Sequence, residues 1–199
     1  MLLPLAFVLA IGAPPGLGGP AATPVDFPLN GGPATGFAGG ATVRIVTDLP
    51  LSPEAQAVFD SDFQATGYFG AFAVSKDGGY GYSTGVGSLQ AAREIALAEC
   101  TAVNGTCLVM AELVPEGYVA PPDGTLTLSQ QVQGHFSTAA KNADFQALAV
   151  SEDGAFAMYW GMASQAEADQ QALADCEANR DRTLAGLRDM PCVLVTNLP

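Results

Sequence analysis

Few residues of this chain have side chains that could do chemistry, and most of those recur in a second copy. His135 is the only histidine, so a histidine-based general acid or base would have to be this residue. Ser75 and Ser151 each stand two residues before the aspartate of an Asp-Gly pair. A serine nucleophile would need a histidine at each position, whereas serine and aspartate around a turn bond the turn backbone. We expect no catalytic residue, and a structural role for His135.

The acidic segments are weak candidates for a metal site. Asp60-Ser61-Asp62 and the Asp-Gly turns resemble fragments of a calcium loop, but none continues to the spacing and final glutamate of an EF-hand loop. A zinc site would need all four cysteines, which form no C-x-x-C pair. We therefore expect no metal and no cofactor.

The four cysteines point instead to disulfides: Cys100, Cys107, Cys176 and Cys192. Three pairings are possible in principle. A sequence repeat, described below, favours Cys100–Cys107 and Cys176–Cys192, because each repeat then closes itself. Loops this short would stabilise each repeat by roughly 2–3 kcal/mol in the chain-entropy model. Even cysteine usage of this kind is typical of proteins outside the reducing cytosol.

The charge balance excludes one class of partner. Twenty acidic against seven basic residues give a net charge of −13, and the pI is about 4.1. A surface this negative repels phosphate backbones, so we expect no nucleic-acid binding. The partner is expected to be a protein or a small molecule of unknown identity.

The amino terminus predicts export. Residues 1–22 read as a signal peptide, with a short apolar run followed by small residues. Residues 23–40 are rich in glycine and proline and read as a flexible linker. No transmembrane segment is expected after leader removal, and the predicted location is the periplasm or the exterior.

The rest of the chain is one unit written twice. Fourteen of the 32 residues from 69 to 100 recur 76 positions later, among them Asp77-Gly78, Ser88 and Cys100. We expect a first repeat over 41–114, a linker over 115–124 and a second repeat over 125–199.

Each repeat reads as β-α-β-β-α-β. In the first, strands are predicted over 41–47, 69–75, 80–86 and 107–114, with helices over 52–62 and from Ser88 to about 103. In the second, strands are predicted over 125–128, 145–151, 155–162 and 192–197, with helices over 129–140 and 164–179. This order predicts an α+β protein of two tandem ferredoxin-like (split βαβ) units, each with its helices on one face of an antiparallel sheet.

One strand of each repeat carries large side chains at alternate positions, on one face of a sheet. They are Tyr80 and Tyr82 in the first repeat, and Phe156, Met158 and Trp160 in the second. Two interpretations stay open. This face lies under the helices or between the units, or it is an exposed strip that binds a partner.

The repeated pattern has a family resemblance. It runs aromatic-x-Ala-x-Ala-Val-Ser-x-Asp-Gly, then Gly-x-x-Ser, then an alanine-rich helix ending in cysteine, then a second cysteine before an apolar strand. This pattern, over residues 69–113 and 145–197, resembles the bacterial DUF4189 family of small exported domains of unknown function. The resemblance implies export and one disulfide per unit, and supplies no catalytic residues.

These observations predict an exported, non-catalytic binding or envelope-associated module. One alternative is a hydrolase-like enzyme with a site at the interface of the two repeats. A second is a sensor of a small ligand or cation.

Overall fold

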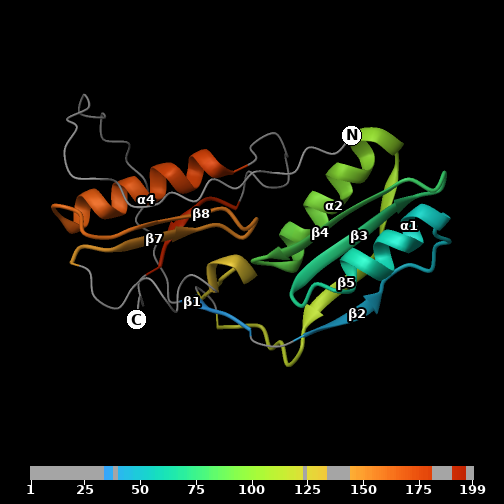
Figure 1. Cartoon of the computed structure of the whole chain (residues 1–199), viewed down its shortest axis with the longest axis horizontal. Helices are drawn as coiled ribbons and strands as arrows, with labels where there is room; N and C mark the ends of the chain where they lie inside the picture. The colour runs from blue at the N-terminus through green and yellow to red at the C-terminus, as the bar shows by residue number, and fades with distance from the viewer. Residues whose placement is uncertain (1–33, 38–39, 123–124, 134–143, 181–189, 196–199) are drawn as a thin grey trace.

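Two units, each a sheet carrying a long helix, lie side by side (Figure 1). The computed structural model describes residues 34–37, 40–122, 125–133, 144–180 and 190–195. Within these residues, no helix has the length and apolar character that crossing a membrane requires. The mixed α+β class with antiparallel sheets is confirmed.

The first unit is built on a four-stranded sheet in the order β2-β5-β3-β4 among the described residues. Its strands are β2 (Ala41–Ile45), β3 (Phe69–Ser75), β4 (Tyr80–Val86) and β5 (Cys107–Pro115). All neighbouring pairs are antiparallel. β3 and β4 form the predicted hairpin, whose turn has Gly78 at φ 86°. That left-handed conformation suits glycine, which has no Cβ.

The helices of the first unit begin where the sequence predicts. Ser52 caps α1 (Pro53–Val58), which continues into the π-helical segment η1 (Phe59–Phe63). Ser88 caps α2 (Leu89–Asn104), and its hydroxyl accepts a hydrogen bond from Ala91 N at 3.1 Å. Serine at this position satisfies an amide that has no partner within the helix.

The prediction that both helices lie on one face of the sheet is wrong for the first unit. Ala71 and Ala73 of β3 pack against α2, whereas Phe72 and Val74 pack against α1 and η1 on the opposite face. The whole of β3 is buried. A strand that is apolar on both faces needs cover on both, which one helix layer cannot provide. The ferredoxin-like arrangement is therefore not confirmed.

The second unit repeats the hairpin, helix and closing strand of the first. Its elements are β7 (Ala147–Val150), β8 (Phe156–Tyr159), α4 (Gln165–Asn179) and β9 (Val193–Leu194). The described strands form an antiparallel sheet in the order β8-β7-β9. Ser164 caps α4 as Ser88 caps α2. Ser129 begins the expected helix over 129–140, which is described only to residue 133.

The first strand of the second unit pairs with a segment that we expected to be a flexible linker. β6 (Leu126–Thr127) pairs in parallel with β1 (Ala34–Thr35), and Leu128 N donates to Thr35 O at 2.8 Å. Residues 34–35 of the predicted linker are therefore part of a strand. Ala34 and Leu126 pack against a cluster that includes Leu128, so burial of apolar side chains contributes to the stability of this pairing.

Candidate ligand cleft between the two units

Both predicted disulfides are present. Cys100 pairs with Cys107 and Cys176 with Cys192, with a Cα–Cα distance of 6.1 Å in each. All four cysteines are buried. Each bond joins the main helix of a unit to the start of its closing strand, so the pairing that the repeat favoured is confirmed.

The first-repeat part of the proposed binding strip lies under a helix. Tyr80 and Tyr82 stack on Phe72, at ring-centroid distances of 5.6 and 6.0 Å. They are partly buried in the cluster that α1 and η1 cover. Of the two interpretations, the one in which this face lies under the helices therefore holds for these two tyrosines.

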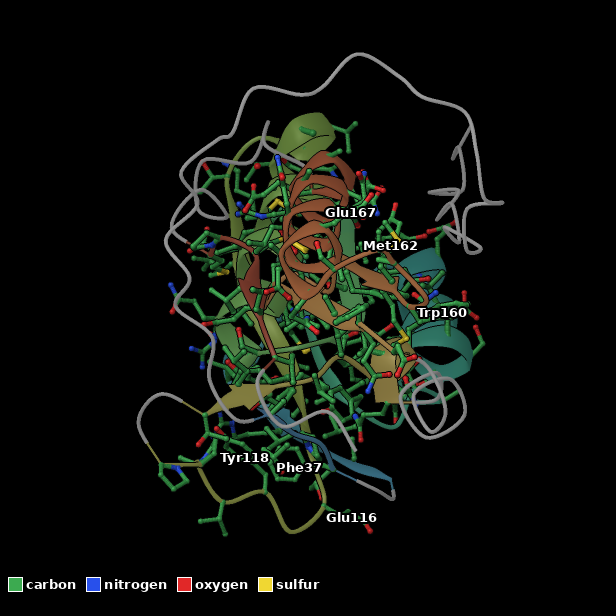
Figure 2. The ribbon with its side chains drawn as sticks, turned by 90° about the vertical axis from the view of Figure 1, so that its left-hand side faces the viewer. Phe37, Glu116, Tyr118, Trp160, Met162 and Glu167 are labelled. Carbon is green, nitrogen blue, oxygen red and sulfur yellow. A yellow bond between two sulfur atoms is a disulfide. The ribbon has the colours of Figure 1, made fainter. Side chains whose placement is uncertain are left out.

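The second-repeat part is mostly covered too. Phe156 and Met158 pack against a cluster around Leu148. Trp160, beyond the end of β8, is exposed by 38%. Figure 2 shows Trp160 apart from Phe37 and Tyr118. The five residues therefore do not form one exposed strip.

The remaining candidates are not assembled into a site by the structure. His135 lies outside the described residues. Asp60 accepts hydrogen bonds from Gln56 and Gln64 on its own helical segment, at 2.9 and 3.0 Å. Within the described residues, no three histidine, cysteine, aspartate or glutamate side chains gather as metal ligands would.

A cleft of about 250 Å³ opens between the two units. Its walls come from the loop before α2, from the segment between the units, from the turn after β7 and from the chain entering β9. The lining residues are Gly87, Ser88, Tyr118, Pro121, Thr125, Leu126, Thr127, Val150, Ser151, Glu152, Met190, Pro191 and Val193. This volume is below the usual range for sites of drug-sized ligands, which limits any occupant of the cleft to a smaller molecule.

Gly87 brings the two units into direct backbone contact. Its N–H donates to Glu152 O at 2.8 Å. A Cβ on this residue would lie 2.8 Å from Thr127 O and 3.1 Å from Glu152 O. Both oxygens belong to the second repeat, so a glycine is required for the units to approach this closely.

The turn that faces Gly87 is held by its own polar side chains. Ser151 Oγ donates to the Asp153 carboxylate, which also accepts from Ala155 N at 3.1 Å. Arg180 at the end of α4 donates to the same carboxylate at 3.2 Å, and both side chains are 5% exposed. The serine and aspartate thus serve the turn, as the sequence predicted.

An aromatic cluster lies at the wall that the segment between the units forms, where Tyr118 lines the cleft. Tyr118 makes edge contacts with Phe37 and Phe69, both at 5.1 Å between ring centroids. Tyr68, next to Phe69, is 1% exposed and donates its hydroxyl to Leu128 O at 2.6 Å. Burial raises the pKa of Tyr68 to about 12, so its phenol stays neutral. These contacts tie the first unit to the start of the second.

The cleft has hydroxyl groups but little charge. Glu152 is the only charged side chain among the described lining residues. The Ser88 hydroxyl caps α2, and the Ser151 hydroxyl bonds the turn. With both serines used in this way, the described walls offer hydrogen bonding and apolar contact rather than an activated nucleophile.

A buried ion-pair cluster lies elsewhere, in the first unit. Glu112 of β5 is fully buried and pairs with Arg44 of β2 and with Arg93 of α2, whose Nε lies 2.6 Å from Glu112 Oε1. Burial by itself raises a carboxyl pKa, but here the hydrogen bonds and charges of the two arginines outweigh it and lower the pKa of Glu112. The cluster joins the edge strand β2 and the helix α2 to β5 of the sheet, and we assign it a structural role.

The sequence did not single out the cleft. Its walls are a Pro/Gly linker, a helix cap and a hairpin turn, each of which has an ordinary local explanation. The one available signal was the enzyme alternative, which placed a site at the interface of the two repeats.

Comparisons with protein-family models, with curated proteins and with solved structures found no match to this chain.

Proposed function

We propose that this protein is an exported, non-catalytic binding module whose small-molecule ligand occupies the cleft between the two units. The observation that carries the proposal is the composition of the walls, because both repeats and the linker contribute to one cavity. Small-molecule sites form preferentially at such junctions, with apolar walls and a few polar groups. The resemblance to the DUF4189 family stays a prediction consistent with this role.

Export is supported by the cysteines. Two buried disulfides close the two units, and no free cysteine is found in the described residues. Such bonds persist in oxidising compartments such as the periplasm or the exterior. The net charge of −13 disfavours nucleic acid as a partner.

A binding role is better supported than hydrolysis by the groups that line the cleft. General acid–base catalysis of hydrolysis uses a positioned pair, such as two carboxylates or a serine with a histidine. The described walls supply one carboxylate, Glu152, and two serines whose hydroxyls are engaged in the cap and the turn. An enzyme at the unit interface therefore remains the second proposal.

A thermal-shift screen with a blocked cleft tests the binding role. The mature chain is screened against a library of small neutral and cationic molecules, beside Thr127→Phe, which places a large side chain at a residue that lines the cleft. Thr101→Phe, on an exposed position of α2, is the matched control. A ligand at 100 times its Kd stabilises a protein by about 2.7 kcal/mol. We expect hits that shift the wild type and Thr101→Phe but not Thr127→Phe.

Two results would count against the proposal. One is a screen with no stabilising compound, and the other is hits that stabilise Thr127→Phe as strongly as the wild type. Turnover of a hit by the wild type, detected by mass spectrometry, would favour the enzyme alternative.

A further inference from the structure

A residue of the second repeat belongs to the core of the first. Met190 is 5% exposed and packs in the cluster formed by α2, β3 and β4, which includes Tyr68, Phe69 and Val86. Its neighbours Cys192 and Val193 belong to the second unit. We call residues Met190–Val193 the strap. The strap therefore crosses from one unit to the other.

The strap is held from the side of the second unit. Cys192 is bonded to Cys176 of α4. The Cys192 N–H donates to Glu177 Oε1 at 2.6 Å, and Glu177 in turn pairs with Arg180 at 3.1 Å. Val193 pairs with Val150 in the sheet. Met190, Pro191 and Val193 all line the cleft, so the element that carries the disulfide is also a wall of the cavity.

The first disulfide provides an internal comparison. Cys100 and Cys107 are separated by 7 positions, and both lie in the core of their own unit. The second pair is separated by 16 positions. No residue from 100 to 107 is among the described residues that line the cleft. The two bonds thus have the same place in the repeat, but only the Cys176–Cys192 bond adjoins a segment that lines the cleft between the units.

We propose that the Cys176–Cys192 bond controls the cleft through the strap: it keeps Met190 docked on the first unit, and without it the two units separate locally and the cavity loses its shape. The Cys100–Cys107 bond stabilises its own unit without this effect. The consequence for ligand affinity rests on the proposed function, whereas the structural coupling does not.

Hydrogen exchange of the Gly87 amide measures the coupling, because this amide donates across the interface to Glu152 O. The probe is the isotope-labelled mature chain in an NMR exchange experiment. Two double variants are compared, Cys176→Ser with Cys192→Ser and Cys100→Ser with Cys107→Ser. The exchange rate of the Gly87 amide in each variant is corrected for the global stability of that variant, which urea unfolding measures. We expect exchange at Gly87 to accelerate at least tenfold beyond the global change in the first variant, and not in the second.

Met190→Ala covers the case in which the first double variant does not fold, because it keeps both disulfides. Truncating a buried methionine removes its packing with the first unit. We expect the same selective acceleration, at least tenfold, at Gly87. The control is Met162→Ala, because Met162 is partly buried against the core cluster of the second unit. It should not accelerate exchange at Gly87 beyond its own global change.

Unchanged corrected exchange at Gly87 in Met190→Ala would overturn the proposal, as would equal acceleration in the two double variants. For any compound found to bind, affinity should fall at least tenfold in Met190→Ala, and an unchanged affinity would overturn control of the cleft. Absence of every ligand would count against the proposed function alone, because the exchange measurement uses no ligand.

Discussion

Replacing Gly87 by alanine should drive the two units apart at a single point. The backbone of Gly87 lies outside the left-handed region, so an alanine there carries no conformational strain of its own. The added methyl group would meet the backbone oxygens of Thr127 and Glu152, at 2.8 and 3.1 Å. Neither oxygen is the end of a flexible side chain, so the contact is relieved only by moving β6 or the turn after β7.

The expected cost follows from that displacement. Real Cβ contacts are rarely closer than 3.4 Å, so the two oxygens must retreat by a few tenths of an ångström. Overpacking of this kind costs about 1–3 kcal/mol, and we expect about 2 kcal/mol here. For a chain of this size the midpoint of thermal unfolding should then fall by about 4–8 °C. The hydrogen bond from Gly87 N to Glu152 O should weaken at the same time.

Urea unfolding followed by circular dichroism measures the change. Gly40→Ala is the matched control, because a Cβ there meets only the Glu116 side chain, at 3.4 Å or more. We expect the control to stay within about 0.5 kcal/mol of the wild type. If Gly87→Ala were as stable as the control, the close backbone approach that defines the cleft would be refuted.

Two further predictions concern the first unit and the exposed tryptophan. Glu112→Gln should destabilise the protein by about 2 kcal/mol at neutral pH, because two charge-assisted contacts of a buried carboxylate are weakened. Since the pKa of Glu112 is lowered, its stabilisation is present above the ordinary carboxyl pKa and is lost as pH falls through the folded value. Urea midpoints of the two proteins should therefore converge in acid, and a constant difference would contradict this. Tyr82→Ala should cost about 3 kcal/mol, because its ring stacks on Phe72 under η1, whereas Trp160→Ala should change stability little. Equal decreases in the midpoint of thermal unfolding for the two variants would contradict this prediction, because they would show that Trp160 is packed as closely as Tyr82.

Local sequence signals were reliable wherever the interaction is short-range. Ser52, Ser88 and Ser164 cap their helices, and glycine follows the aspartate in both turns. A helix cap or tight turn is satisfied by atoms within a few residues, so the sequence contains the information. The disulfide pairing was predictable for the same reason, because each bond closes a short loop within a repeated unit.

Predictions that depended on distant partners were less successful. Every residue of β3 is buried and only Ser75 is polar, yet its sequence does not say whether the two helices share a face. Tyr80 and Tyr82 alternate as a binding strip would, but η1 and Phe72 cover them. Alternation defines a face of a strand, and only packing decides what that face contacts.

By itself the sequence determined a duplicated α+β unit, its caps and turns, and two local disulfides. Tertiary structure alone decided that the helices of the first unit lie on opposite faces of its sheet. It also decided that residues 34–35 pair with β6, and that Met190 enters the neighbouring unit. The reason is physical: hydrogen bonds within a turn are set by adjacent residues, whereas burial of apolar surface is non-directional and accepts any partner of suitable shape.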